Sequence, residues 1–292
     1  MTLLVFGRTG QLAQALAAQV QVTCLGRDRA DLFDPAACAA AIRAVKPRAV
    51  INAAAYTAVD RAEAEEAQAM VVNAEAPGAM ARECARLGVP FVFVSTDYVF
   101  DGSGAAPWGP GDSPAPLNAY GRSKLAGERA VAGAGGAWAV IRTAWVFSGQ
   151  DGNFVTTLLA RARERERLAV VDDQIGGPTP ARALAAACLA AAEQLASDPG
   201  KAGLYHFAGT PEVSRAGFAR EIVAQAGVGG EREEVGPYHD PKPGRRGLEF
   251  RHECKAFTAT VGLDRPERGE EPRILLAGKR RGGVWEGRPR AK

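Results

Sequence analysis

The first half of the chain alternates short apolar runs with longer Ala-rich stretches, and this alternation limits the possible folds more than any other feature. The apolar runs have the length of buried strands, and the Ala-rich stretches have helical composition. The predicted strands are residues 2–6, 21–26, 48–53, 90–95 and 137–143, and the predicted helices are residues 10–19, 35–45, 60–87 and 118–133. The order strand, helix, strand predicts an α/β fold with a Rossmann-like doubly wound parallel sheet, covered by helices on both faces.

Two segments interrupt this rhythm. The helix at 60–87 is expected to break around Ala76-Pro77, because proline cannot donate a backbone hydrogen bond. Residues 103–117 contain four prolines and three glycines, which predicts a loop long enough to have a function.

After about residue 145 the pattern changes. The sequence predicts the exposed face of a charged helix at 161–167, a strand at 169–171, an Ala-rich helix at 179–196, a strand at 204–207, and a helix that Ser214 caps and that runs to about Ala226. We therefore expect an NADP-binding Rossmann domain over residues 1–145. Residues 146–292 should mainly form a smaller α/β lobe for the substrate, with elements near 168–196 returning to the Rossmann sheet.

A glycine-containing turn follows the first predicted strand. Its sequence is Gly7-Arg8-Thr9-Gly10-Gln11-Leu12. Glycine permits a tight turn and a close approach of the backbone to a pyrophosphate, and the N-terminus of the following helix offers free N–H groups. Ala13 is small enough for that helix to pack on the strand. These six residues are the predicted start of a dinucleotide site.

The end of the second predicted strand bears on cofactor choice. An acidic side chain there would accept hydrogen bonds from the ribose of NAD, whereas Gly26 removes the acid and Arg27 offers a guanidinium suited to a phosphate. The sequence favours NADPH, with NADH kept as an alternative. The competing interpretation is that Arg27 is a surface arginine without a ligand.

Tyr120 and Lys124 stand four residues apart, on one face of a predicted helix. A free phenol has a pKa near about 10, and a nearby ammonium together with a positively charged nicotinamide ring would lower it toward the working range. Thr96, at the end of the fourth strand, can donate a hydrogen bond to a carbonyl oxygen as charge develops there. The three residues predict an enzyme that moves hydride between a nicotinamide cofactor and a ketone.

These motifs resemble the extended short-chain dehydrogenase/reductase superfamily and, within it, the dTDP-4-dehydrorhamnose reductase family. The likeness extends to about residue 225. The matching segments are residues 6–12, 52–60, 95–102, 116–128, 142–146, 153–154, 173–179 and 203–206.

The resemblance implies a role for each matching residue. Tyr120 would donate the proton, Lys124 would act as its electrostatic partner and hold the nicotinamide ribose, and Thr96 would stabilise the alkoxide. The sugar nucleotide would contact Thr96, Asp97, Trp145 and Asn153. The pyrophosphate would contact Gly10, Gln11 and Leu12, the adenine end Asp31 and Leu32, and the nicotinamide side Ala55, Tyr56 and Thr57. Ala53 and Ala54, with Ala55, form a run of small side chains that leaves room for the cofactor to pass close to the backbone. The implied reaction reduces the C4 ketone of dTDP-4-dehydro-L-rhamnose with hydride from NADPH.

The chain departs from the family pattern in three places. Ala13 stands where many relatives have glycine. Residues 238–250 differ from the usual Pro-rich turn followed by Arg-Pro, an Asn-Ser pair and a short Leu-containing segment, and the tail after Leu263 does not match the usual closing helix. We therefore assign no site residue beyond about residue 225.

Composition excludes several classes of protein. The chain has no apolar run of the roughly 20 residues that a membrane helix requires, and its start has no secretory pattern, so a cytoplasmic protein is expected. Six of the basic side chains fall in residues 278–292, which argues for a solvated tail and against a nucleic-acid-binding face.

The five cysteines and three histidines show no metal-ligand spacing, so no metal site is predicted. A dTDP-sugar is the expected partner. The sequence leaves open a requirement for Mg²⁺ and the oligomeric state, a homodimer included.

Two alternative functions remain. A sugar-nucleotide dehydratase would have Glu after the Thr-Asp pair where this chain has Tyr98, and an epimerase would favour an acid at the end of the second strand. A non-catalytic NADP-binding regulatory subunit is the second alternative, and the intact set of Thr96, Tyr120 and Lys124 argues against it.

Overall fold

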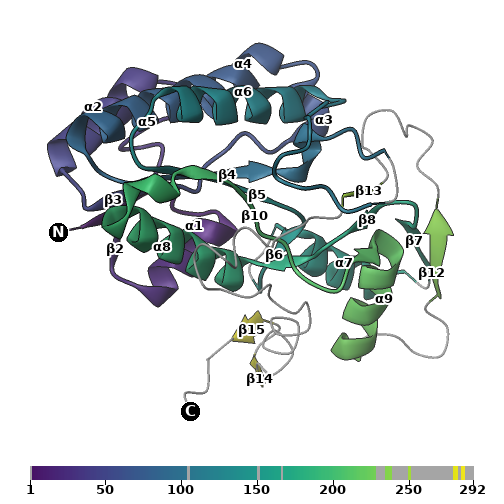
Figure 1. Ribbon diagram of the computed structural model, residues 1–292. Helices are drawn as coiled ribbons and strands as arrows, with labels where there is room; N and C mark the ends of the chain where they lie inside the picture. Colours follow the sequence, from purple (N-terminus) through teal and green to yellow (C-terminus); the bar gives the residue numbers. More distant parts are fainter. Residues whose placement is uncertain are drawn as a thin grey trace.

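The computed structural model describes residues 2–103, 106–149, 152–165 and 167–227, together with short strands at 234–238, 249–250, 279–281 and 284–286. Figure 1 shows a layered body of helices on a central sheet, with a second lobe beside it.

The centre of the first domain is a six-stranded sheet in which every neighbouring pair is parallel. The strands in spatial order are β10 (Gly203–His206), β5 (Trp138–Thr143), β4 (Phe91–Thr96), β3 (Ala49–Asn52), β1 (Leu3–Phe6) and β2 (Val22–Leu25). The chain passes from β1 to β2 on one side and then to β3 on the other. This reversal opens a crevice at the carboxyl ends of β1 and β3, where ligands of doubly wound sheets bind.

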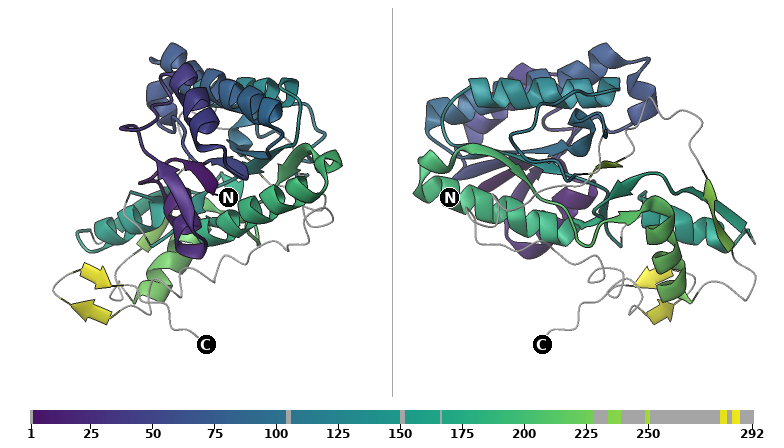
Figure 2. Two further views of the ribbon diagram at one scale, coloured as in Figure 1. Left: turned by 90° about the vertical axis from the view of Figure 1, so that its left-hand side faces the viewer. Right: turned by 45° about the vertical axis from the view of Figure 1, so that its right-hand side comes forward.

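Helices cover both faces of the sheet, as Figure 2 shows from two further directions. One layer contains α2 (Pro35–Val45), α5 (Ala76–Leu87) and α6 (Ala119–Gly133), and the opposite layer contains α1 (Gln11–Gln19) and α8 (Ala181–Ser197). Alternation along β1 explains the two cores: Leu4 and Phe6 join the first, and Leu3 and Val5 join the second. The predicted strands and the fold class are confirmed.

The predicted break in the helix at 60–87 takes a different form. The segment folds as α3 (Val59–Ala62), α4 (Glu66–Met70), a π-helical turn η1 (Val71–Glu75) and α5. The helical path is therefore interrupted at residues 63–65, and near Ala76-Pro77 it continues. Pro77 cannot donate to the carbonyl four residues earlier, and the π-helical turn stands directly before α5.

The second lobe packs two helices, α7 (Phe154–Ala162) and α9 (Arg215–Ala226), around a small core that includes Phe147, Leu158 and Phe218. Its strand pairs are β7 (Arg167–Val171) with β12 (Glu234–Tyr238), β8 (Ile175–Gly176) with β11 (Val213–Ser214) and β13 (Glu249–Phe250), and β6 (Val146–Phe147) with β9 (Thr179–Pro180). The remaining short elements are η2 (Asp97–Val99), η3 (Pro199–Lys201) and the antiparallel pair β14 (Lys279–Arg281) and β15 (Val284–Glu286).

The prediction that residues 161–167 form one charged helix face is wrong. Helix α7 ends at Ala162, with Arg161 in its last turn, and Arg167 begins β7. A basic side chain suits a helix C-terminus, where carbonyl groups carry partial negative charge.

Parts of residues 146–292 contact the first domain. Helix α8 packs on the central sheet, and β10 pairs with β5 as its edge strand, whereas β7 pairs with β12 outside that sheet. Ser214 caps α9 through its side chain, which accepts a hydrogen bond from the Gly217 N–H. The structure also confirms two other expected elements within a residue or two at each end: the strand at 204–207 is β10, and the helix at 179–196 is α8.

No helix in the described part of the chain combines the length and the apolar character needed to cross a lipid bilayer. The four cysteines that the structure describes are free thiols. His239, His252, Cys254 and most of the two segments that depart from the family pattern lie outside the described residues.

Candidate active site

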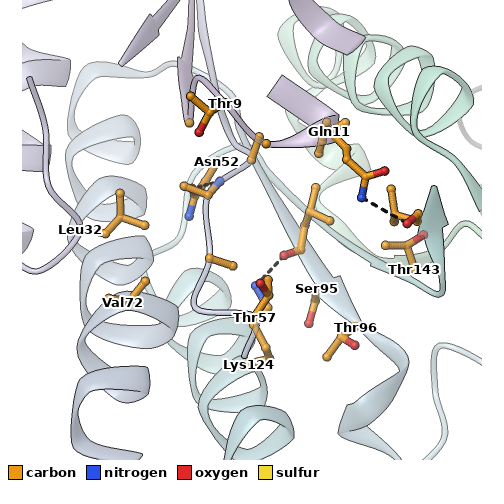
Figure 3. Close-up of a pocket in the computed structure, with 18 of the residues that line it drawn as sticks. Thr9, Gln11, Leu32, Asn52, Thr57, Val72, Ser95, Thr96, Lys124 and Thr143 are labelled. Carbon is orange, nitrogen blue, oxygen red and sulfur yellow. Dashed lines mark hydrogen bonds between the residues drawn. The ribbon is translucent and has the colours of Figure 1, made fainter. Parts of the chain in front are cut away.

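A cavity of about 990 Å³ opens at the carboxyl ends of β1, β3, β4 and β5. Figure 3 shows Thr96, Lys124 and Thr57 near one end of it, with Leu32 and Val72 on one wall and Thr143 on the other. The site therefore occupies the switch point that the strand order creates.

The turn between β1 and α1 forms one end of this cavity. Gly7 has a φ of +114°, a conformation that favours glycine, and the backbone of Ala53 and Ala54 lies 3.4 Å from where its Cβ would stand. Gly10 is the N-cap of α1 and supplies no side-chain cap, and open space surrounds the position of its missing Cβ. The first N–H groups of α1 can therefore receive an anionic group.

Tyr120 and Thr96 meet where the start of α6 packs on η2. Asn118 caps α6 by accepting a hydrogen bond from the Gly121 N–H at 2.7 Å, which places Tyr120 in the first turn. A Cβ at Gly121 would lie 2.1 Å from the Tyr98 carbonyl oxygen, so only glycine allows this close approach. Tyr120 and Thr96 both line the cavity, and Thr96 Oγ1 donates to Asp97 Oδ1 at 2.9 Å.

The protonation of Tyr120 depends on opposing effects. Burial raises the pKa of the phenol above its ordinary value, and the hydrogen bond with Thr96 opposes this rise. The cost of desolvating a phenolate sets this direction, and the expected lowering, which depends also on the charge of a nicotinamide ring, stays a prediction. The Lys124 Nζ donates instead to the Val94 carbonyl oxygen at 2.7 Å and lies 4.0 Å from the centre of the Phe93 ring.

Lys124 is only 1% exposed. Burial lowers the pKa of its amine to about 7, and the charge of Glu128 acts in the opposite direction. The side chain therefore changes its charge near neutral pH, unlike an exposed lysine.

A buried ion pair lies one helical turn beyond Lys124. The Arg142 guanidinium donates to Glu128 through Nη2 at 2.7 Å and through Nε at 3.0 Å, and the two side chains are 3% and 4% exposed. Ser95 Oγ donates to the same carboxylate at 2.5 Å. The pair joins β4, β5 and α6 directly beneath the cavity.

The second lobe contributes Arg215, the first residue of α9, to the cavity wall. Its guanidinium carbon lies 3.9 Å from the centre of the Trp145 ring and 5.1 Å from that of Phe154. Burial raises the pKa of Asp97 to about 7, whereas Thr96 and the positive charge of Arg215 act to lower it.

A second cavity, of about 420 Å³, lies in the second lobe and also has Arg215 in its wall. Phe154, Thr157, Arg161 and Gln174 are among its other lining residues. Arg215 therefore stands where the two cavities approach each other.

Three buried polar atoms in the wall of the larger cavity have no hydrogen-bond partner among the described residues. They are Asn52 Nδ2, Asp97 Oδ2 and Thr143 Oγ1. Buried polar groups are almost always satisfied, and unsatisfied ones on residues that line a cavity leave hydrogen-bonding capacity for a polar partner there. Together with the open N-terminus of α1, they fit a dinucleotide beside an oxygen-rich substrate.

Residues 1–271 match the family model described as the RmlD substrate binding domain. The chain belongs to this family. Among curated proteins, a dTDP-4-dehydrorhamnose reductase of Burkholderia thailandensis is 47% identical over 232 residues, which cover 77% of this chain and 78% of the relative. The protein of the same name from Escherichia coli (strain K12) is 35% identical over 281 residues, covering 91% and 94%.

Solved structures of proteins with the same name superpose closely on this chain. A dTDP-4-dehydrorhamnose reductase of Clostridium acetobutylicum gives a TM-score of 0.85 at 30% identity, over 94% of this chain and 98% of that one. The enzyme of Bacillus anthracis, solved in complex with NADP, gives 0.84 at 27% identity, with the same two coverages.

Most of the predicted site residues of this RmlD family member line the larger cavity. They are Gly7, Arg8, Thr9, Gly10, Gln11, Leu12, Arg27, Asp31, Leu32, Ala53, Ala54, Ala55, Thr57, Thr96, Asp97, Tyr120, Lys124 and Trp145. Tyr56 and Asn153 are not among the lining residues. The Tyr56 hydroxyl donates to Glu65 at 2.5 Å, and Asn153 caps α7 and donates to the Ser148 carbonyl oxygen at 2.9 Å.

The sequence interpretation assigned no site role to several residues of the cavity wall, among them Asn52, Thr143, Arg215 and Asp28. Asp28 Oδ1 lies 2.6 Å from where a Cβ of Gly26 would stand, and Oδ2 accepts from Arg8 Nη1 at 3.1 Å. A carboxylate therefore does lie near the end of β2, although Gly26 occupies the strand end itself. The sequence signal for this carboxylate was an acidic residue two positions after Gly26.

The pKa of Lys124 predicts how stability changes with pH. The folded protein holds this amine at a pKa of about 7 against an ordinary value of 10.5, so between those values it binds fewer protons than the unfolded chain. The contribution of Lys124 to the free energy of unfolding therefore rises with pH through this window, and below it the burial of the charged amine is fully unfavourable.

We expect Lys124→Met to have its largest stability advantage over the wild type near about pH 7 and a smaller one near about pH 9.5. Urea denaturation at both pH values measures the two differences. An equal difference at the two pH values would contradict the lowered pKa.

Proposed function

We propose that this chain catalyses the NADPH-dependent reduction of the C4 ketone of dTDP-4-dehydro-L-rhamnose to dTDP-L-rhamnose. The observation that carries the proposal is that Tyr120, Thr96 and Lys124 line one cavity together with the open N-terminus of α1. The curated relatives named dTDP-4-dehydrorhamnose reductase support the same reaction.

Tyr120 acts as the general acid. Its raised pKa keeps the phenol protonated at neutral pH, so the hydroxyl has a proton to give to the C4 oxygen as that oxygen becomes an alkoxide. Thr96 lies beside it and hydrogen-bonds the same developing charge. When bound, NADPH supplies the hydride and, once oxidised, a positively charged ring that favours the phenolate left on Tyr120.

Lys124 lies one helical turn after Tyr120 and lines the same cavity. Its Nζ is fixed by the Val94 carbonyl oxygen and lines the cavity, where it can hold the ribose next to the nicotinamide. Burial excludes water from the amine, so the position of Nζ is set by α6 and β4 and does not depend on solvent.

The adenine end favours NADPH over NADH. Arg8 and Arg27 both line the cavity beside β2, where a 2′-phosphate would lie, and the Asp28 carboxylate is already paired with Arg8. We expect kcat/KM for NADPH to exceed that for NADH by about tenfold or more, the effect of one charged hydrogen bond. Equal or better efficiency with NADH would contradict this preference.

Arg215, Trp145 and Asp97 form the substrate end. Trp145 and Phe154 hold the guanidinium of Arg215 at the junction of the two cavities, where it can pair with the diphosphate of the sugar nucleotide. The smaller cavity then lies beyond the diphosphate, on the nucleoside side.

Arg215→Ala should raise the KM for the sugar nucleotide by about tenfold or more, because one charge-assisted contact is lost. The dissociation constant of NADPH should change by less than about twofold, since the cofactor end is distant. Arg220→Ala is the matched control: Arg220 lies on the same helix, its side chain is 50% exposed, and its carboxylate partner Asp172 is 3.9 Å away. Equal effects of the two changes would refute the role of Arg215.

The assay that decides between the functions follows NADPH absorbance with dTDP-4-dehydro-L-rhamnose as substrate. Oxidation of NADPH with formation of dTDP-L-rhamnose supports the reductase. Folded protein that binds NADPH without oxidising it would favour a regulatory subunit. Turnover of a dTDP-sugar without net oxidation would favour a dehydratase or epimerase.

A further inference from the structure

Trp145 has an unusual backbone conformation that the proposed mechanism does not explain. Its φ is +47°, in the left-handed region, where a bulky side chain is rare and the conformation costs free energy. The residue stands between β5 and β6, where the chain leaves the central sheet for the second lobe. Such an outlier persists only where surrounding contacts hold it. We therefore expect the contacts of the indole ring to stabilise this conformation.

One of these contacts is with the backbone of β8. A Cβ at Gly176 would lie 2.9 Å from Cε2 of the Trp145 ring, 3.0 Å from Cζ2 and 3.3 Å from Nε1. Carbon atoms in van der Waals contact are about 3.5–4.0 Å apart, so a side chain at this position would overlap the indole. Gly176 is buried and its φ is not positive, so the ring contact, and not the backbone conformation, requires glycine here.

The second contact of the ring is with Arg215, whose guanidinium carbon lies 3.9 Å from the ring centre. The segment that carries Gly176 also fixes the backbone of Arg215. Ile175 pairs with Ser214 in the antiparallel register of β8 and β11. The Arg215 N–H donates to the carbonyl oxygen of Gln174 at 3.0 Å. Residues 174–176 therefore contact both the indole and the residue that stacks on it.

The cavity wall contains Trp145 and Arg215, whereas Gly176 is not among its lining residues. Gly176 can therefore act on a ligand only through the two side chains. A shift of the indole away from β8 would displace the guanidinium that lies against it, because a close-packed interior does not absorb such a shift. The position of Arg215 in the cavity thus depends on the absence of a side chain at residue 176.

We propose that Gly176 is a positioning residue for the substrate end of the site: its missing side chain seats the Trp145 indole and, through the ring, the Arg215 guanidinium. The inference rests on the proposed function for the ligand that Arg215 would meet, the diphosphate of the sugar nucleotide. Its structural content, the seating of the ring against β8, does not depend on the ligand.

Three variants separate the ring contact from other effects of the substitution. Gly176→Ala adds the Cβ that would overlap the indole. Gly111→Ala is the matched control, because Gly111 also has no positive φ and open space surrounds the position of its missing Cβ. Both changes reduce the freedom of the unfolded backbone alike, so a difference between them reports the contact. Trp145→Phe supplies a smaller ring, which leaves room for the added methyl group.

The first readout is kinetic. Gly176→Ala should raise the KM for the sugar nucleotide by about tenfold and leave kcat and the dissociation constant of NADPH within about twofold, because a displaced guanidinium weakens binding and not the chemical step. Gly111→Ala should keep all three wild-type values. In a Trp145→Phe background, Gly176→Ala should raise KM by less than about twofold, since the overlap is gone. Equal effects of Gly176→Ala in the two backgrounds would overturn the proposal, as would a wild-type KM.

The second readout is fluorine NMR of protein that contains 5-fluorotryptophan, because a fluorine chemical shift responds to local packing. The chain has four tryptophans, and the Trp145 signal is the one that Trp145→Phe removes. This signal should move in Gly176→Ala and stay in place in Gly111→Ala. An unmoved Trp145 signal in Gly176→Ala would refute the seating. Because this measurement needs no substrate, a moved signal in a protein that does not reduce the dTDP-sugar would count against the proposed function alone.

Discussion

Replacing Tyr120 with phenylalanine should lower kcat by about 10²- to 10⁴-fold, the range attributed to a positioned acid. The change removes one oxygen and keeps the ring, which packs edge-on against Tyr98 with ring centres 5.6 Å apart. The dissociation constant of NADPH should remain within about twofold, because the proposed dinucleotide site includes the turn after β1 as well as the phenol. Steady-state kinetics and a fluorescence titration with NADPH measure the two quantities.

Tyr205→Phe is the matched control for Tyr120→Phe. Tyr205 lies on β10, and its hydroxyl donates to the Lys201 carbonyl oxygen away from the cavity. The Tyr205→Phe variant loses the same phenol oxygen and should keep the wild-type kcat. If Tyr120→Phe retained more than about a tenth of wild-type kcat, another group would have to be the acid.

Replacing Glu128 with glutamine should lower the free energy of unfolding by about 3–5 kcal/mol, the usual effect of removing one partner from a buried ion pair. Glutamine keeps the shape of the side chain and can still accept from Ser95, so the main loss is the negative charge opposite Arg142. The Arg142 guanidinium, 3% exposed, would then be buried without a counter-charge. Urea denaturation at neutral pH measures the change.

Two further variants test this explanation. The double replacement Glu128→Leu with Arg142→Met should lose less stability than Glu128→Gln, because an apolar pair leaves no buried charge. Glu66→Gln breaks the exposed pair with Arg122, whose side chains are each 40% exposed, and should cost only about 0–1 kcal/mol. Similar losses for Glu66→Gln and Glu128→Gln would show that burial of the pair does not determine its contribution.

The sequence by itself determined the sheet and much of the cavity. Each of the strands β1 to β5 is a short apolar run between helical segments, and hydrophobic period and turn residues are local properties that can be read along the chain. Gly7, Gly10 and Thr96 lie at strand ends for the same reason. Because the carboxyl ends of parallel strands share one edge of a sheet, residues from separate motifs were predicted to meet there, and they line one cavity.

Other features were decided only by the tertiary structure, because they depend on contacts between segments distant in sequence. Asp28 reaches the end of β2 through its pairing with Arg8, Arg215 enters the site from the second lobe, and Asn73 meets Tyr56 and Ser123 through a π-helical turn. The charge states of Tyr120 and Lys124 were also inaccessible to sequence, since desolvation by the surrounding fold outweighs the mutual influence that their spacing suggests. Motif spacing places residues on a common face, but burial is a property of the assembled layers.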